Sequence, residues 1–176
     1  MSQPIDPVLL RRALGAFVTG VTVVTTRTAD GEPVGLTVNS FNTVSLSPPL
    51  VLWSLSLHAA SFTTFVRASH FVVNVLSAHQ RLISERFATT GGDKFSGVAW
   101  RSTLADMPLL EGTAASFTCR NAHQFPGGDH LIFLGEVVAF ERAARPPLVY
   151  TNGGYAELRE TSRPSVVLSS DPVTTG

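Results

Sequence analysis

The segment from residue 35 to residue 51 constrains the fold of this chain more than any other. It reads GLTVNSFNTVSLSPPLV, with short hydroxyl and amide residues between two apolar runs and a Pro-Pro pair before a third. Because short polar side chains and prolines favour turns, the pattern predicts a strand, a polar turn, a second strand and a second turn. The turn side chains are short, so backbone N–H and C=O groups there stay accessible to a bound planar molecule.

Further apolar segments are bounded by turn residues and are predicted as strands. Asp30-Gly31 predicts a hairpin turn, and residues 91–106 and 122–129 are predicted as loops. Many short strands, few helices and frequent turns predict a mainly β chain that forms an antiparallel barrel or sandwich. The predicted strands are 19–28, 33–38, 71–76, 114–121, 130–142 and 147–150, with two more within 40–57 that divide at Pro48-Pro49.

Three helices are predicted from their start signals. Asp6-Pro7 provides a capping carboxylate followed by proline, and apolar spacing continues from there until Gly20. Ser61 begins a short second helix. Residues 77–80 fit a capping box, and the helix that follows them stops before Gly91-Gly92.

Composition favours a folded protein of one domain. The chain has 176 residues, of which 44% are hydrophobic and 15% charged, so it can bury a real core. We expect residues 1–160 to form that domain. Residues 161–176 turn to Ser, Thr and Pro, which predicts a mobile tail or an arm on a neighbouring molecule.

Charge and cysteine usage exclude several classes of partner. Lys and Arg (13) balance Asp and Glu (13), which argues against nucleic acid or an acidic membrane as the main partner. Serines, prolines and His58 interrupt the longest uncharged stretch, so no membrane helix is expected. Cys119 is the only cysteine, which rules out an intrachain disulfide and suits a reducing cytoplasm. Residues 1–12 show no signal peptide, and Cys119 is predicted to be a buried, inert thiol.

Common catalytic and nucleotide-binding motifs are missing from the sequence. It contains no GxGxxG, GxxxxGK[ST], HExxH or GxSxG, and no carboxylate pair stands out. His123 and His130 could approach each other across a loop, but no third ligand is evident and no metal site is predicted. The remaining features are small polar residues at strand ends, the turn Gly128-Asp129-His130 and aromatic side chains. This set fits a protein that positions a cofactor and leaves the chemistry to it.

Seven short segments, in order and at matching spacing, resemble the flavin reductase family, whose small members hand reduced flavin to a partner monooxygenase. The resemblance covers roughly residues 10–158. The segments are TGVTVVTT (19–26), TVNSF (37–41), PPLV (48–51), FVVNVL (71–76), DKFSGV (93–98), GDH (128–130) and PLVY (147–150) with Gly154-Tyr155.

The resemblance implies an FMN-binding split barrel, which is a Greek-key antiparallel barrel with added helices. It also implies a homodimer with flavin near the subunit interface, FMN or FAD as acceptor, and NADH or NADPH as donor. Hydride transfer from nicotinamide to flavin N5 needs two stacked rings with reacting atoms about 3–3.5 Å apart, rather than an acid or base. A partner oxygenase would then be reached by flavin diffusion. The alternatives are a same-fold flavoenzyme that uses its own reduced flavin, and a non-catalytic flavin-binding protein.

The resemblance also assigns roles around the flavin ring. One group of residues would hold the ring and the ribityl chain, and the alternative for them is ordinary Asx or Ser turns. A second group would line the far wall through backbone groups, and the alternative is an edge strand with solvated serines. The first group is Thr37, Asn39, Ser40 and Phe41, and the second is Ser54, Leu55 and Ser56.

Phosphate and nicotinamide contacts complete the predicted site. Ser61, at a helix start, and Lys94 are phosphate candidates, against the alternatives of a plain N-cap and a solvated charge. The family often has Thr after the matching serine, where this chain has Phe62; Thr63 takes that role if the register slips by one. This departure leaves the choice between FMN and FAD open. His130 would act beside the nicotinamide and flavin rings, or else would be a turn histidine paired with its neighbour.

Overall fold

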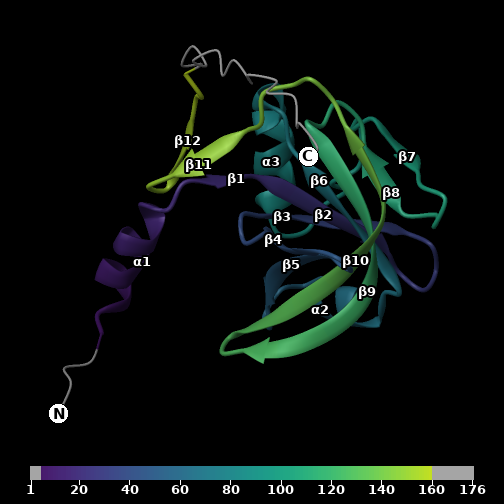
Figure 1. Cartoon of the computed structure of the whole chain (residues 1–176), viewed down its shortest axis with the longest axis horizontal. Coiled ribbons are helices and arrows are strands. Elements are labelled where there is room, and N and C mark those ends of the chain that lie inside the picture. Colours follow the sequence, from purple (N-terminus) through teal and green to yellow (C-terminus); the bar gives the residue numbers. More distant parts are fainter. Residues whose placement is uncertain (1–4, 160–176) are drawn as a thin grey trace, which may run out of the picture.

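The computed structural model describes residues 5–159, and its centre is one curled sheet of seven strands (Figure 1). All neighbouring strands pair antiparallel, so the predicted antiparallel barrel is confirmed. The proposed tail, 161–176, lies outside the described residues. In order across the sheet, the strands are β3 (Pro33–Val38), β2 (Thr22–Arg27), β6 (His70–Val75), β9 (Ala115–Gly127), β10 (His130–Arg142), β5 (Pro49–Ser56) and β4 (Asn42–Leu46).

The barrel has an open seam between its two edge strands. These edges, β3 and β4, are consecutive in the chain and are joined by residues 39–41. Both strands have the bounds that the Pro-Pro pair and the polar turn predict, within one or two residues. The polar turn therefore lies at the split of the barrel, where a strand edge has no neighbouring strand.

Aromatic side chains fill the barrel interior. Trp53 is fully buried on β5 and stacks on Phe133 with ring centroids 4.6 Å apart. Phe71 from β6 and Phe65 from helix α2 (Phe62–Arg67) pack edge-on against the same indole. Burying one such ring contributes about 1.5–3 kcal/mol, so α2 is held in place by Phe65.

A second apolar cluster lies between the sheet and helix α3 (Arg81–Ala88), which a short 3-10 turn (Ala78–Gln80) precedes. Phe87 is its main contribution from α3. The predicted capping box is present: the Ser77 N–H donates to Gln80 Oε1 at 3.0 Å. This cluster fixes α3 against β3, next to the polar turn.

An arm extends from the barrel on its N-terminal side (Figure 1). It consists of helix α1 (Pro7–Gly15) and a three-stranded sheet of β1 (Thr19–Gly20), β11 (Val149–Thr151) and β12 (Gly154–Ala156). Asp6 caps α1 as predicted, with Oδ1 accepting from Val8 N at 2.7 Å. No residue of α1 is buried within the chain.

Four elements differ from the predictions, because pairing with another segment decided them. Helix α1 ends at Gly15 rather than Gly20, since the Gly15 carbonyl accepts from Asn152 N at 2.7 Å and the chain turns into β1. The predicted loop 91–106 contains β7 (Trp100–Ser102), which pairs with β8 (Pro108–Leu110). The predicted loop 122–129 is mostly strand, and only Gly128-Asp129 form the turn between β9 and β10. The strand β12 was not predicted.

Candidate functional site

A cavity of about 650 Å³ opens beside β3 and contains three of the predicted site residues, Thr37, Ser61 and Lys94. Its walls come from β3, from the loop between β5 and α2, and from the end of α3 with the loop after it. The lining residues are 32–37, 58–61 and 87–95. Segments far apart in the sequence therefore supply one hydroxyl-bearing and cationic surface.

The β3 wall is fixed by contacts with α3. Thr37 is half-buried, and its Oγ1 donates to the Ser84 carbonyl at 2.7 Å. Gly35 lets Phe87 approach closely, because a Cβ built on Gly35 would lie 2.8 Å from Phe87 Cε1. This wall of the cavity is therefore formed where strand β3 packs directly on helix α3.

The polar turn, residues 39–41, bridges the open seam of the barrel at one point. Ser40 Oγ accepts from Ser54 N at 3.0 Å and donates to the Ser54 carbonyl at 3.1 Å. Phe41 turns inward and stacks on Phe117, with ring centroids 5.8 Å apart. Asn39 is exposed. A ligand at this turn would therefore meet the Asn39 side chain and the backbone, whereas the Ser40 hydroxyl is occupied.

The predicted far wall, 54–56, alternates along β5. Leu55 is buried in the core, while the side chains of Ser54 and Ser56 are half-buried on the other face. The pairing of β5 with β4 ends at Leu52, so the edge beyond it has no strand partner. Ser40 bonds to this edge at Ser54. By the two-residue repeat of a strand, the Ser56 backbone N–H points to the same edge. The Ser56 carbonyl accepts from the Ala59 N–H at 3.0 Å.

Ser61 and Lys94 supply polar groups to the cavity. Ser61 lies at the N-cap of α2, and within residues 5–159 its side chain makes no capping hydrogen bond. Lys94 Nζ donates to the carbonyls of Phe87 at 3.2 Å and Gly35 at 3.4 Å. Partial burial lowers the Lys94 pKa. The ammonium has three N–H donors, so one is left for an anionic ligand.

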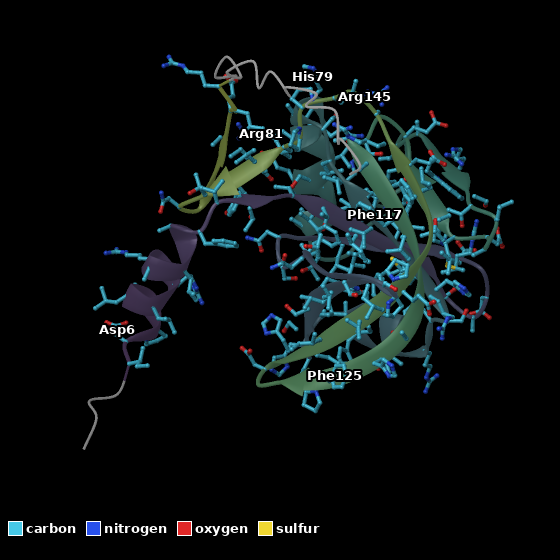
Figure 2. All side chains as sticks on the ribbon, in the orientation of Figure 1. Asp6, His79, Arg81, Phe117, Phe125 and Arg145 are labelled. Carbon is cyan, nitrogen blue, oxygen red and sulfur yellow. The ribbon has the colours of Figure 1, made fainter. Side chains whose placement is uncertain are left out.

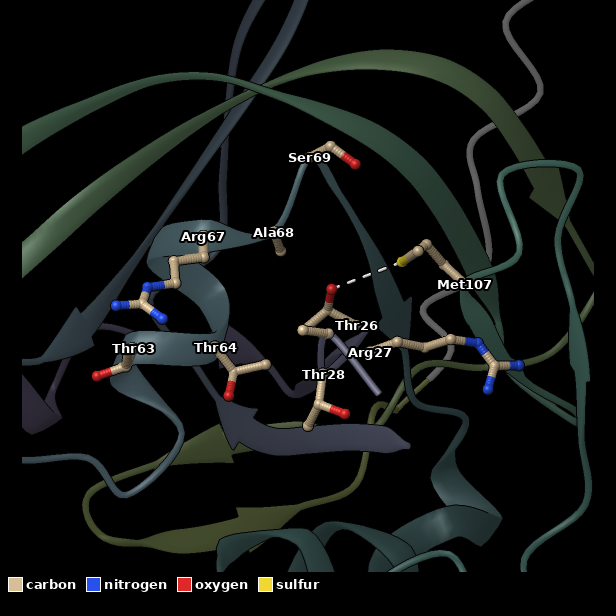
Figure 3. A pocket seen from close by; sticks show the side chains of 10 residues that line it. Thr26, Arg27, Thr28, Thr63, Thr64, Arg67, Ala68, Ser69 and Met107 are labelled. Carbon is tan, nitrogen blue, oxygen red and sulfur yellow. Dashed lines mark hydrogen bonds between the residues drawn. The ribbon is translucent and has the colours of Figure 1, made fainter. Parts of the chain in front are cut away.

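The structure does not bring Thr63 to this cavity. Thr63 is exposed on α2 and lines a second pocket, of about 310 Å³. Figure 3 shows Thr63, Thr64 and Arg67 on one side of that pocket. Thr63 lies outside the candidate cavity because one step along a helix turns a side chain by about 100°, and its role in place of a family threonine stays a prediction.

His130 lies at the end of the long hairpin, near the cavity but outside its lining. Its Nδ1 lies 2.7 Å from Asp129 Oδ1, and this hydrogen bond, then the His130 charge, lowers the Asp129 pKa. The Leu57 N–H donates to the Asp129 carbonyl at 3.0 Å. The hairpin tip is thereby tied to the loop that carries His58 into the cavity wall.

Sequence reasoning missed several residues of the cavity. Glu32, His58 and the loop 89–92 line it, although the sequence indicated only a turn and a helix stop at the loop. Asp93 also lines it, with Oδ1 accepting from the N–H groups of Phe95 at 3.0 Å and Ser96 at 3.1 Å. The pair Gly91-Gly92 was the one available signal in the sequence. In the structure both residues have positive φ, which glycine adopts readily.

The walls suit a planar ligand that carries phosphate. Val34, Leu36, Phe87 and Phe95 provide apolar surface, and the Thr37 and Ser61 hydroxyls and Lys94 provide polar contacts. Within residues 5–159, no group of three or more His, Cys, Asp or Glu side chains is placed to hold a metal ion. Across the same residues, no helix has the length and apolar character needed to cross a bilayer.

Comparison with known proteins identifies close relatives. The family model described as "Flavin reductase like domain" matches residues 14–159. FMN reductase (NADH) SmoA of Agrobacterium fabrum is 46% identical over 145 residues, which cover 82% of each chain. The reductase component of flavin-dependent trigonelline monooxygenase from Acinetobacter baylyi is 41% identical over 146 residues, or 83% of this chain. This chain spans about half, 47%, of the length of that relative.

A solved structure agrees with the sequence comparisons. The NADH:FAD oxidoreductase SgcE6 of Streptomyces globisporus superposes with a TM-score of 0.85 and 38% identity. The alignment covers 92% of this chain and all of that one. The same enzyme has also been solved in complex with NAD and FAD fragments.

Proposed function

Because this chain belongs to the flavin reductase-like domain family, we propose that it reduces FMN or FAD with a nicotinamide and supplies reduced flavin to a partner monooxygenase. The predicted family and the predicted split barrel are both confirmed. Catalysis would consist of stacking two rings, because direct hydride transfer needs orientation more than an acid or base.

The observation that carries the proposal is the cavity that joins Thr37, Ser61 and Lys94 next to the polar turn. Apolar walls would accept the flavin ring, and the turn would present backbone groups to its polar edge. Ser61 and Lys94 would bind the flavin phosphate, since hydroxyl and ammonium donors bind anions well. His130 would stand at the nicotinamide side, where the hairpin tip meets the loop that carries His58.

We propose NADH as the preferred donor. Recognition of the 2′-phosphate of NADPH generally uses an arginine, and the described cavity lining includes none. Its basic side chains are Lys94, already bonded to two carbonyls, and His58, while Glu32 and Asp93 are acidic. The 2′-phosphate of NADPH would therefore be repelled by the two carboxylates more than it would be attracted by the basic side chains. FMN reductase (NADH) SmoA and NADH:FAD oxidoreductase SgcE6 carry the same donor in their names.

We also propose that two copies form a homodimer through the arm. Leu9, Leu14 and Phe17 are 61%, 64% and 72% exposed, although all three are large and apolar. An isolated helix of nine residues is unstable in water, and such an apolar surface usually marks an interface. A second copy could cover it. The lone, buried Cys119 is consistent with a cytoplasmic location, which completes the proposal.

A single kinetic experiment separates the proposed activity from its alternatives. NADH oxidation is followed by absorbance without oxygen, which would reoxidise reduced flavin, with added FMN, FAD or riboflavin, and then with NADPH. A reductase turns over many equivalents of added flavin, whereas an enzyme that uses only its own flavin stops near one equivalent per site. A flavin-binding protein without catalytic function oxidises no NADH, and that result would refute the proposal.

A matched pair of variants tests where the phosphate lies. Ser61→Ala removes a hydroxyl from the cavity, and Thr63→Ala removes one from α2 that faces the other pocket. We expect Ser61→Ala to weaken FMN about 10–150-fold, in line with one lost hydrogen bond to a charged group, with riboflavin little affected. Thr63→Ala should match the wild type. Equal effects of the two changes would contradict the placement.

A further inference from the structure

A partly buried hydrogen-bond chain crosses helix α3 and joins the arm to the polar turn. The hydroxyl oxygens of Tyr155, on β12, and Ser84, on α3, lie 2.9 Å apart. The Ser84 carbonyl accepts from Thr37 Oγ1 at 2.7 Å. Ser84 is only 1% exposed. Three segments far apart in the sequence are therefore connected through one buried serine.

The tyrosine at the outer end of the chain is itself held in place. The ring of Tyr155 packs edge-on against that of Tyr150, with centroids 5.5 Å apart. The Arg81 guanidinium lies 5.0 Å from the Tyr155 ring centroid, beside the β11–β12 hairpin (Figure 2). Arg81 in turn pairs with Glu85 at 2.8 Å. The Tyr155 hydroxyl thus has a defined direction toward Ser84.

At the inner end, this chain determines how Thr37 meets a ligand. Thr37 uses its only hydroxyl hydrogen on the Ser84 carbonyl, so its oxygen faces the cavity as an acceptor. That acceptor stands two residues before Asn39, where the chain leaves β3 for the seam. A shift of α3 would move the acceptor and the start of the turn together.

Packing alone gives no reason for this arrangement. A buried serine that only filled space could be replaced by alanine without leaving an unpaired group, whereas Ser84 requires the Tyr155 hydroxyl as its partner. Tyr155 lines a different pocket, with His79 and Arg81, and Ser84 does not line the cavity, so neither hydroxyl would contact the flavin. Both hydroxyls instead help to fix the position of α3 relative to β3.

We propose that Ser84 and Tyr155 are positioning residues for the flavin site, which act through the Ser84 carbonyl on Thr37. The proposal rests on the proposed function, because it assumes that flavin binds beside Thr37. Neither side chain need touch flavin or nicotinamide.

The test compares Tyr155→Phe and Ser84→Ala with a matched control, Tyr150→Phe. Within residues 5–159 the Tyr150 hydroxyl makes no hydrogen bond, although its ring packs against Tyr155. We expect Tyr155→Phe and Ser84→Ala each to weaken FMN binding about 3–10-fold, as for one lost buried hydrogen bond. The visible spectrum of bound FMN should shift toward that of free FMN. Tyr150→Phe should leave both properties unchanged.

A double variant distinguishes positioning from a general loss of packing. Ser84→Ala combined with Tyr155→Phe should cost no more FMN affinity than either single change, because both break the same bond. Thr37→Val should give the same spectral shift, whereas Thr37→Ser, which keeps the hydroxyl, should restore the wild-type spectrum. Thermal unfolding of each variant is followed in parallel to confirm folding.

The outcomes separate this proposal from the one it rests on. Wild-type protein that neither binds FMN nor oxidises NADH with added flavin would overturn the proposed function, and this inference with it. Wild-type activity, with Tyr155→Phe indistinguishable from Tyr150→Phe in affinity and spectrum, would overturn only the positioning role. A fall in unfolding temperature without any change in the bound-flavin spectrum would also overturn it.

Discussion

Replacing Gly35 with alanine should destabilise the protein, because β3 lies directly on α3 at this residue. A Cβ built there would lie 2.8 Å and 3.0 Å from two atoms of the Phe87 ring and 3.1 Å from Thr25 Cγ2. Phe87 is 1% exposed and packs edge-on against Phe95, with centroids 5.0 Å apart. The ring is therefore held between β3 and Phe95, and it can yield to an added Cβ only by losing this packing.

Two opposing terms set the size of the effect. Alanine loses less conformational entropy than glycine on folding, which favours the variant by roughly 0.5–1 kcal/mol. Overpacking a well-filled core costs about 1–3 kcal/mol. The second term wins here, because the contact joins two backbone-anchored elements, and the net loss should be about 1–2 kcal/mol. For a chain of this size, that lowers the unfolding temperature by roughly 2–8 °C.

The assay is thermal unfolding at one fixed protein concentration, since self-association would shift the midpoint. Gly20→Ala is the control, because nothing lies within 4 Å of a Cβ built on Gly20. That variant should be as stable as the wild type or slightly more so. Phe87→Leu removes the ring edge, so the double variant Gly35→Ala with Phe87→Leu should lose less than the two single losses added together. Equal stability of Gly35→Ala and Gly20→Ala would refute the reasoning.

Three other experiments test the site and the core. Lys94→Met should weaken FMN far more than riboflavin in fluorescence titrations, because only FMN carries phosphate; an equal loss for both would assign Lys94 to folding. Since burial lowers the Lys94 pKa, the wild-type preference for FMN should also be lost, as pH rises, at a lower pH than an exposed lysine would give. His130→Ala should raise the NADH KM or slow hydride transfer about 10–100-fold with little change in flavin affinity, and unchanged kinetics would return His130 to its pairing with Asp129. Burial raises the Cys119 pKa to about 12, so Ellman's reagent should react with this thiol only after unfolding, and rapid reaction of the native protein would contradict its burial.

Local chemistry was enough to predict the elements whose ends are set by their own residues. Strand β3 and the capping box before α3 are examples, since proline, glycine and Ser-x-x-Gln act within a few residues. Pairing across the barrel set the other boundaries. The segment 122–127 carries Pro126 and looks like a loop, yet β10 recruits it into a strand of thirteen residues. Nothing within that segment indicates its partner.

The candidate site could likewise be predicted only in part from the sequence. Thr37, Ser61 and Lys94 line one cavity, and for Thr37 and Ser61 the sequence placed the strand end and the helix start correctly. The loop 89–92 escaped notice, since small exposed residues carry no pattern in sequence. Thr63 lies outside that cavity, because a helix start predicted to within one residue still leaves the direction of each side chain open.

Ser40 illustrates the limit of motif reasoning most clearly. Its short side chain suggested a residue that leaves room for a ring, and the split barrel does place it beside an open strand edge. Its hydroxyl, however, bonds to both the N–H and the carbonyl of Ser54, as the backbone of a neighbouring strand would. A strand edge with unsatisfied groups would otherwise be open to water or to another chain. The serine therefore closes one step of the seam. The Ser56 carbonyl already accepts from the Ala59 N–H, so the Ser56 N–H is the next backbone group left for a ligand. A small polar residue is required at position 40 both to leave room for a ring and to bond to the Ser54 backbone. The motif can therefore locate the site without indicating which atom contacts the flavin.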